Sequence, residues 1–224
     1  FLAEENIADF IVKKSRSKST KKDNYAQYID EVSKEDKIEL SDEQKEAILN
    51  SLVNDVTVIT GGPGTGKTTI IKFIIELYKN ENKKVVLCAP TGRAAKRMSE
   101  ATGEEATTIH RLLCLGKTEE TLGMERVDYQ IEPIDCDVII IDEASMVDVF
   151  LMNYILKGLF IGTTIVLVGD IDQLPSVGPG NVLKDIIGSG VIETIELNEI
   201  FRQAAQSQII TNAHKVNNGE SFLD

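Results

Sequence analysis

The stretch VTVITGGPGTGKTTIIKFIIELY, residues 56–78, decides the fold of this 224-residue chain. Its first residues are all β-branched, which is typical of a buried strand, whereas its last eleven have the apolar spacing of a helix. Between them lies GGPGTGKT, residues 61–68, which fits the phosphate-binding pattern GxxxxGK[ST]. We therefore expect a strand, a glycine-rich loop and a helix in this order.

The residue types of this loop suit a phosphate ligand. Glycines let backbone N–H groups close around phosphate oxygens, and the N-terminus of the following helix adds positive potential. Lys67 should reach the β- and γ-phosphates, and Thr68 should hold Mg²⁺. A chance glycine-rich turn is the alternative, and the strand–loop–helix context argues against it. The expected nucleotide-binding residues here are Gly61, Gly62, Pro63, Gly64, Thr65, Gly66, Lys67, Thr68 and Thr69.

Short apolar runs recur along the chain and alternate with segments of helical spacing. They are VTVIT (56–60), VVLCA (85–89), DVIIID (137–142), TIVLVGD (164–170) and IETIEL (192–197). Strands without polar alternation are buried on both faces, which predicts a parallel sheet covered by helices, a three-layer α/β/α fold. In such a sheet a ligand binds beyond the carboxyl ends of the strands.

A second strand end carries paired carboxylates. The run 138–141 leads into Asp142 and Glu143. An aspartate there can hold Mg²⁺ together with Thr68, and Glu143 can orient and deprotonate an attacking water. Such a pair taken alone is more often a solvated cap; together with the phosphate loop it predicts the hydrolytic half of a site. No NKxD base-reading motif occurs, which disfavours a GTP-specific switch.

A third strand end is followed by GDIDQLP, residues 169–175. The topology should bring Gln173 close to the same γ-phosphate, and a glutamine can donate to a phosphate oxygen while it accepts from a water. We expect Gln173 to sense the nucleotide state. Asp170 and Asp172 have the alternative role of capping the turn before the proline, which we favour for Asp172.

Composition limits the partners. The formal net charge is -12, from 24 basic and 36 acidic residues, so any contact with nucleic acid must be local. The basic run 13–23 is interpreted as a linker, with a phosphate-gripping loop as the alternative. Cys88, Cys114 and Cys136 have no metal or disulfide spacing and are expected to be reduced and buried. No apolar stretch is long enough to span a bilayer, so we expect a cytoplasmic protein without a membrane partner.

Seven blocks in sequence order resemble the motifs of the superfamily 1 DNA helicases. The likeness is strongest to the RecD-like group, which includes the alpha subunit of exodeoxyribonuclease V and moves 5′ to 3′ on single-stranded DNA. It runs from about Leu40 to Gly219 and implies a RecA-like P-loop NTPase fold. The blocks are LSDEQKEAI (40–48), GGPGTGKTT (61–69), APTGRAAKRM (89–98), TTIHRLL (107–113), IIIDEASMVD (139–148), VGDIDQLPSVGPGNVLKDII (168–187) and LNEIFRQAAQSQIITNAHKVNNG (197–219).

The resemblance assigns further roles in nucleotide binding. It implies that Gln44 reads adenine, which favours ATP; the sequence itself predicts that Ser41 caps a helix with Gln44 completing a capping box, and both roles can coexist. It implies that Gln173 links γ-phosphate sensing to the DNA groove. It also implies that Arg202 reaches the γ-phosphate from a second motor domain; a surface arginine paired with Glu199 or another acidic residue is the alternative.

The resemblance also implies contacts with single-stranded DNA. Arg93, Lys96 and Arg97 are spaced to share one helix face and could form a local phosphate track, although a solvated amphipathic face is the alternative. His110 could instead be a hydrogen-bonded core residue. The residues expected at the DNA are Pro90, Thr91, Gly92, Arg93, Thr108 and His110.

The expected organisation has three parts. Residues 1–37 should end an upstream domain and form a linker, 38–197 should form the first motor domain, and 198–224 should begin a second one. By resemblance, a small hairpin that splits the duplex is inserted at about 114–131. We expect the chain to be a piece of a longer protein. By itself this piece should hydrolyse little nucleotide and should not translocate.

The parent protein is expected to hydrolyse ATP with Mg²⁺, to move on single-stranded DNA and to unwind duplex junctions in recombination and repair, with exonuclease V-type subunits as further partners. Two alternatives stay open. One is a P-loop ATPase switch or loader that does not translocate. The other is a nucleic-acid-binding module with a vestigial phosphate loop, which the joint presence of Lys67, Thr68, Asp142 and Glu143 disfavours.

Overall fold

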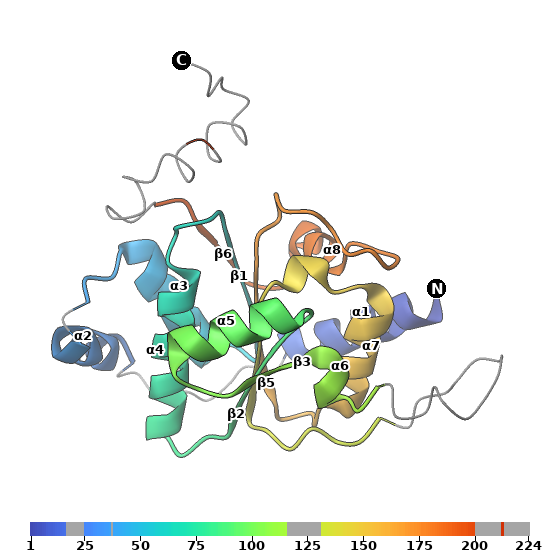
Figure 1. Ribbon diagram of the computed structural model, residues 1–224, viewed down its shortest axis with the longest axis horizontal. Helices are drawn as coiled ribbons and strands as arrows, with labels where there is room; N and C mark the ends of the chain where they lie inside the picture. The colour runs from blue at the N-terminus through green and yellow to red at the C-terminus, as the bar shows by residue number, and fades with distance from the viewer. Residues whose placement is uncertain (17–24, 37, 116–130, 200–211, 213–224) are drawn as a thin grey trace.

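The structure is a computed structural model that describes residues 1–16, 25–36, 38–115, 131–199 and 212. Within these residues, six strands form one fully parallel sheet in the order β3-β2-β4-β5-β1-β6. Figure 1 shows the strands at the centre of the fold with helices on either side. The predicted parallel α/β fold is confirmed. The strands are β1 Val56–Gly61, β2 Val85–Ala89, β3 Ala106–Thr108, β4 Val138–Ile141, β5 Thr164–Gly169 and β6 Thr194–Leu197.

Five of these strands coincide with the apolar runs of the sequence, and β3 does not. Its three residues, Ala106–Thr108, are only partly buried and pair with β2 alone. An edge strand of this length buries too little surface to need an apolar run, so its sequence carries no strand signal.

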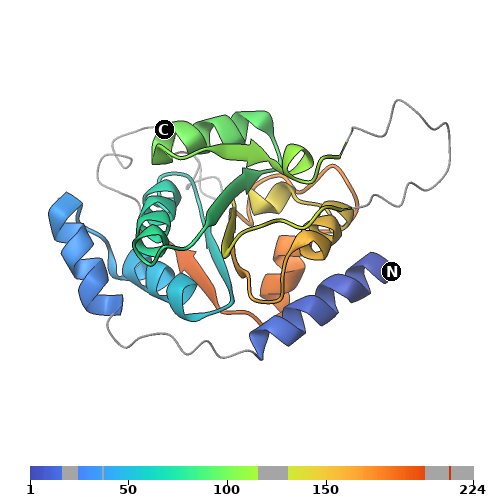
Figure 2. The same ribbon diagram turned by 90° about the horizontal axis from the view of Figure 1, so that it is seen from below.

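Helices cover both faces of the sheet (Figure 2). The side chains of the strands alternate between two hydrophobic clusters: Ile139 and Ile141 of β4 belong to one, and Val138 and Ile140 belong to the other. This alternation buries both faces and produces the three-layer arrangement. The helices are α1 Leu2–Ser15, α2 Tyr25–Asp36, α3 Asp42–Val53, α4 Lys67–Asn80, α5 Gly92–Thr102, α6 Ile109–Leu112, the 3₁₀ turn η1 Ala144–Met146, α7 Val149–Gly158 and α8 Val182–Ser189.

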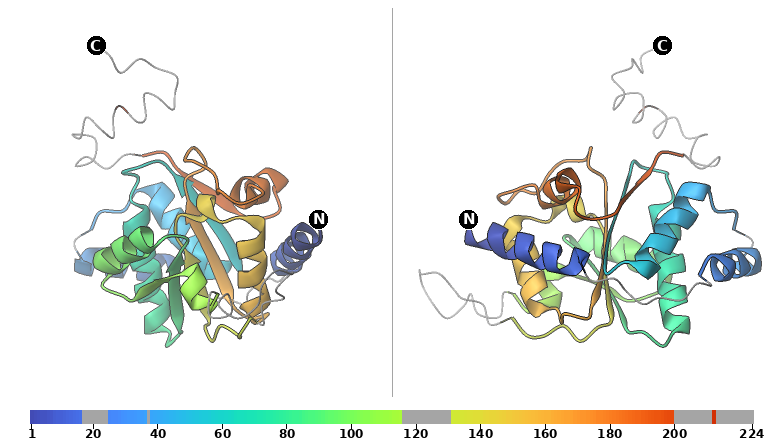
Figure 3. Two further views of the ribbon diagram at one scale, coloured as in Figure 1. Left: turned by 45° about the vertical axis from the view of Figure 1, so that its right-hand side comes forward. Right: turned by 180° about the vertical axis from the view of Figure 1, so that it is seen from behind.

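The first helices pack on the sheet domain. Ile7 and Ile11 of α1 join the cluster formed with α7 and α8, and Figure 3 shows α1 lying beside these helices. The Lys14 ammonium, at the end of α1, is buried and donates a hydrogen bond to the Thr163 carbonyl. Ile29 of α2 belongs to the cluster on the opposite face. The two helices thus pack into the outer layers of the fold, and the domain boundary at residue 38 stays a prediction.

Some expectations concern residues outside the described ranges. These are most of the basic run 13–23, nearly all of the hairpin insertion expected at 114–131, Arg202, and the expected start of a second motor domain beyond residue 199. Among the described helices, none is both long and apolar enough to cross a membrane.

The cysteine prediction is confirmed for two residues and wrong for the third. All three cysteines are free, and Cys88 and Cys136 are buried. Cys114 is exposed, with a positive φ of 54° just after α6. The left-handed conformation is common just after a helix, and here the Cys114 side chain faces solvent.

Candidate nucleotide and DNA site

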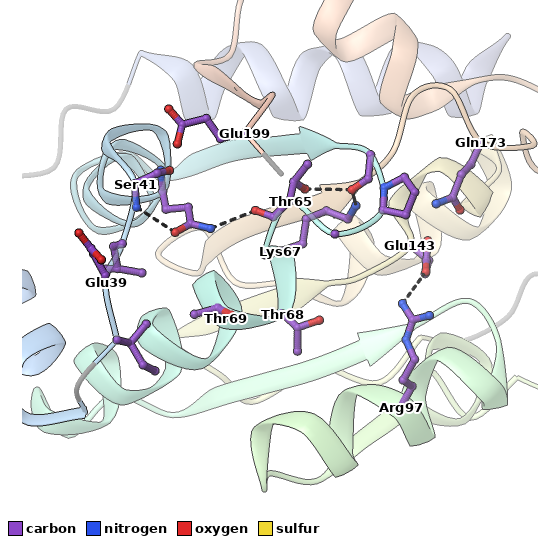
Figure 4. Close-up of a pocket in the computed structure, with 17 residues that line it drawn as sticks. Glu39, Ser41, Thr65, Lys67, Thr68, Thr69, Arg97, Glu143, Gln173 and Glu199 are labelled. Atoms are coloured by element: carbon purple, nitrogen blue, oxygen red, sulfur yellow. Dashed lines mark hydrogen bonds and ion pairs between the residues drawn. The ribbon is translucent and has the colours of Figure 1, made fainter. Parts of the chain in front are cut away.

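The strand order brings three loops to one edge of the sheet. β5 lies between β1 and β4, with Thr60 opposite Gly169 and Ile141 opposite Leu167. The segments that follow these three strands surround a cavity of about 1170 Å³ (Figure 4). It is lined by Ile38, Glu39, Leu40, Ser41, Gln44, Gly62, Pro63, Gly64, Thr65, Gly66, Lys67, Thr68, Thr69, Arg97, Glu143, Gln173 and Glu199.

The phosphate loop needs its glycines for two different reasons. Gly64 and Gly66 have φ of 83° and 84°, in the left-handed region that other residues rarely adopt. Gly61 ends β1 against β6, and a Cβ atom at this position would lie 2.9 Å from the Leu197 Cβ. The loop passes directly into α4 at Lys67, as the sequence predicts.

Lys67 turns back onto its own loop. Its ammonium donates hydrogen bonds to the carbonyl oxygens of Gly61, at 2.5 Å, and Gly62, at 2.9 Å. Burial lowers the pKa of Lys67, and the carboxylates of Asp170, Glu143 and Asp142 oppose that shift. A partly desolvated cation with one N–H beyond these two bonds suits an anionic ligand.

Gln44 connects α3 to the phosphate loop. The predicted capping box is present, since the Ser41 N–H donates to Gln44 Oε1 at 3.1 Å and the Gln44 N–H donates to Ser41 Oγ at 3.3 Å. The Gln44 amide also donates from Nε2 to the Thr65 carbonyl at 3.0 Å. The side chain is therefore held at the wall of the cavity, and its contact with adenine stays a prediction.

Asp142 is buried directly beyond β4, and one of its carboxylate oxygens accepts the Glu143 N–H at 2.9 Å. Burial raises the pKa of Asp142, while that backbone hydrogen bond, Arg97 and Lys67 lower it. No group of three or more His, Cys, Asp and Glu side chains among the described residues could hold a metal ion. A single carboxylate and the Thr68 hydroxyl would therefore need phosphate oxygens and waters to complete a Mg²⁺ shell, which is how this ion is commonly bound.

Glu143 has an unusual backbone and a free acceptor. It adopts the left-handed region at φ 52° and ψ 40°, where non-glycine residues are strained. Its Oε1 accepts a hydrogen bond from Arg97 Nη2 at 3.1 Å, and its buried Oε2 has no hydrogen-bond partner among the described residues. Burial and, next, the Asp142 charge raise the pKa of Glu143. The side chain can therefore accept a further donor at the cavity.

Gln173 lines the cavity and is held by a neighbour. Its Nε2 donates to Asp170 Oδ2 at 3.0 Å, and the other oxygen of Asp170 accepts the Asp172 N–H at 3.0 Å. Asp170 is buried and accepts the backbone N–H two residues later, so it caps this turn, which agrees with the cap role that the sequence offered as an alternative. The cap role favoured for Asp172 and the sensor role of Gln173 stay predictions.

The two segments expected at DNA lie side by side. Ala89 of β2 pairs with Thr108 of β3, so residues 90–93 and 108–110 leave the sheet at neighbouring strand ends. Thr91 caps α5 by accepting the Ala94 N–H at 3.2 Å, and Thr108 caps α6 in the same way. His110 is exposed, so its interpretation as a core residue is wrong.

The sequence groups Arg97 with Arg93 and Lys96 on one face of α5 toward DNA, which stays a prediction, and in the structure Arg97 also lines the nucleotide cavity. It contacts Glu143 across the edge of the sheet, whereas Lys96 pairs with Glu100 on its own helix at 3.8 Å. Spacing shows only that two residues share a helix face. Because β2 and β4 are neighbours, α5 faces the end of β4, and this adjacency is not written in the sequence.

Known proteins resemble this chain in sequence. A family model described as an AAA domain matches residues 44–179. The ATP-dependent RecD2 DNA helicase of Deinococcus radiodurans is 40% identical over 182 residues, which cover 81% of this chain and 24% of that protein. The RecBCD enzyme subunit RecD of Mycolicibacterium smegmatis is 34% identical over 206 residues, covering 81% and 37%.

Solved structures show the same fold. A Pif1 helicase from Candida albicans has a TM-score of 0.56 and 28% identity, covering 80% of this chain and 44% of that one. A structure of two coordinating Pif1 helicases at forked double-stranded DNA has a TM-score of 0.59 with 24% identity, covering 81% and 48%. The chain thus spans less than half of each of these proteins. It belongs to the AAA domain family, and the relatives that it matches over 81% of its length are a RecD2 DNA helicase and a RecD subunit.

Proposed function

We propose that this chain carries the ATP-hydrolysing motor of a cytoplasmic DNA helicase that moves on single-stranded DNA and unwinds duplexes in recombination and repair. One observation carries the proposal: Lys67, Glu143 and Gln173, which follow three different strands, line a single cavity. The names of the relatives, a DNA helicase and a RecBCD subunit, support the same activity. Movement 5′ to 3′ and association with exonuclease V-type subunits follow from the resemblance alone.

The cavity suits ATP in its charge and in its acceptors. Lys67 offers a partly buried ammonium to the phosphates, and Gln44 lies beside the loop where it can meet the base. Thr68 and Asp142 would hold Mg²⁺. When bound, this ion neutralises charge on the phosphate oxygens.

Hydrolysis requires a base at the γ-phosphate. Water attacks the γ-phosphorus, the bond from phosphorus to the β–γ bridging oxygen breaks, and the water proton passes to the Glu143 carboxylate. Lys67 stabilises the charge on the phosphates, and Arg202 from a second motor domain adds a guanidinium when the domains close. Gln173 reports the presence of the γ-phosphate to the DNA groove.

The DNA track is proposed along the ends of β2 and β3. Arg93 lies in the first turn of α5, next to the segment with Thr108 and His110. A local track of this kind is compatible with the acidic net charge, because phosphate contacts need only nearby cations.

The test is the ATPase rate of the full-length protein with and without single-stranded DNA. Lys67→Ala should lower turnover by about a hundred-fold or more, the usual loss when one stabilising donor is removed. Lys84→Ala serves as the control. Lys84 precedes β2 at the amino-terminal ends of the strands, away from the cavity, and pairs with Asp135.

Turnover of Lys67→Ala at the wild-type rate would contradict the nucleotide site. A wild-type rate that DNA leaves unchanged would favour a switch or loader that does not translocate. Gln173→Ala should hydrolyse ATP but lose most of its response to DNA, and wild-type coupling in that variant would remove the sensor role.

A further inference from the structure

The only ion pair of the proposed base within the described residues is with an arginine on α5. Arg97 Nη2 lies 3.1 Å from Glu143 Oε1, and both side chains line the nucleotide cavity (Figure 4). The carboxylate is largely enclosed, with its side chain 14% exposed, whereas the arginine side chain is 68% exposed. The glutamate is thus fixed in place, and the arginine is free to move outward.

α5 links this ion pair to the proposed DNA track. Arg93 lies in the first turn of the helix and Arg97 one turn later, so the two arginines share one face. Neither Arg93 nor Arg97 is buried. A DNA backbone that contacts Arg93 would therefore pass within reach of the Arg97 guanidinium, which can bind a phosphate through two N–H groups.

The ion pair constrains Glu143 as a base. One carboxylate oxygen already accepts a charged donor, which holds the side chain in one orientation. The other oxygen is buried, and no residue in the described part of the chain donates a hydrogen bond to it. While Arg97 stays bound, the carboxylate cannot turn freely toward a water at the γ-phosphate.

We propose that Arg97 is a positioning residue that restrains Glu143 until single-stranded DNA draws its guanidinium onto a backbone phosphate. This inference rests on the proposed function, because it takes Glu143 as the base and α5 as part of the DNA track. It gives DNA a physical route to the hydrolytic site through one helix. Release of the arginine frees the glutamate at the moment when the motor is on its track.

The experiment compares ATPase kinetics of the full-length protein and its Arg97→Ala variant. Without DNA, kcat should rise roughly two- to five-fold, the size expected from an ion pair whose arginine is exposed to solvent, while KM for ATP stays within about two-fold. At saturating single-stranded DNA both proteins should turn over at similar rates, so the stimulation by DNA falls by the same factor. Arg97→Lys, which keeps the charge, should restore part of the restraint.

Lys84→Ala is the control, since it breaks the 2.6 Å ion pair of Lys84 with Asp135 at the far end of the strands, where both partners are exposed. It should keep the wild-type rates with and without DNA. The thermal unfolding midpoint of each variant should stay at the wild-type value, which separates the effect from misfolding.

Three results would overturn the inference. Arg97→Ala turnover that falls equally with and without DNA would make Arg97 a ligand of the nucleotide phosphates. Unchanged kinetics would make the ion pair inert, and a rise in KM without a rise in kcat would place Arg97 in substrate binding. In contrast, a wild-type protein that DNA does not stimulate would refute the proposed function itself.

Discussion

At the scale of single residues, the site depends on positions where side-chain size is limited by the backbone of a neighbouring strand. Gly61 is the clearest example, because β6 passes so close that a Cβ atom would lie 2.9 Å from both the Leu197 Cβ and the Leu197 carbonyl oxygen. Backbone atoms cannot move aside as a flexible side chain can. The first glycine of the loop is therefore required by packing, in addition to any role toward phosphate.

Gly61→Ala should lower the free energy of unfolding by about 1–3 kcal/mol, because β6 must shift to accept the methyl group. The control is Gly188→Ala in α8, where an added Cβ meets nothing within 4 Å and should be neutral or stabilising. Denaturant unfolding of the two variants measures both effects. Equal stabilities would show that β6 does not restrict this position.

The three thiols should react at different rates. Burial raises the pKa of Cys88, and it raises the pKa of Cys136 to about 11, with the charges of Asp135 and Asp137 as further causes. Cys114 is exposed. A thiol reagent at neutral pH should modify Cys114 rapidly in the native chain and all three cysteines only after unfolding, as spectrophotometric titration would show. Fast native modification of Cys88 would contradict its burial.

At the scale of secondary structure, helices fix the ends of the strands that carry the site. α3 is an example, since Glu43 Oε2 accepts the backbone N–H groups of Asn198, at 2.7 Å, and Glu199, at 3.2 Å. The next residue of α3, Gln44, binds the phosphate loop. One helix end therefore holds both the loop and the segment that leaves β6.

α1 lies outside residues 44–179, which the family model matches, and a mutation in it can show whether this helix belongs to the fold. Ile7→Ala should lower the free energy of unfolding by about 2–4 kcal/mol, because Ile7 is 7% exposed within the cluster of α7 and α8. Leu2→Ala is the matched control on the same helix, since Leu2 is 71% exposed and should have little effect. Equal effects in denaturant unfolding would mean that α1 does not pack on this domain.

At the scale of the whole molecule, strand order assembles the site from distant segments. β5 separates β1 from β4, so the loops after these three strands surround one cavity, and the β2–β3 pair places the candidate DNA residues next to it. The chain as a whole is acidic, with a formal net charge of -12. Any contact with DNA must then come from few cations.

A local track predicts a shallow salt dependence of DNA binding. Each phosphate contact with single-stranded DNA contributes about -0.7 to the slope of log K against log salt concentration. Arg93→Ala in the full-length protein should therefore reduce the slope by about 0.7, whereas Lys84→Ala at the far end of the strands should leave it unchanged. Fluorescence anisotropy over a series of salt concentrations measures the slope, and an equal change in both variants would remove Arg93 from the track.

The sequence by itself determined the parallel α/β fold, five of its strands, the phosphate loop and the capping box at Ser41, because hydrophobic periodicity, glycine spacing and cap residues act over a few neighbouring residues. Tertiary structure alone decided that β3 forms an edge strand, that Cys114 faces solvent and that Arg97 reaches Glu143. The physical reason is that these features depend on which strands become neighbours and how the helices lie across them. That order is set by the packing of the whole chain, and no local pattern encodes it.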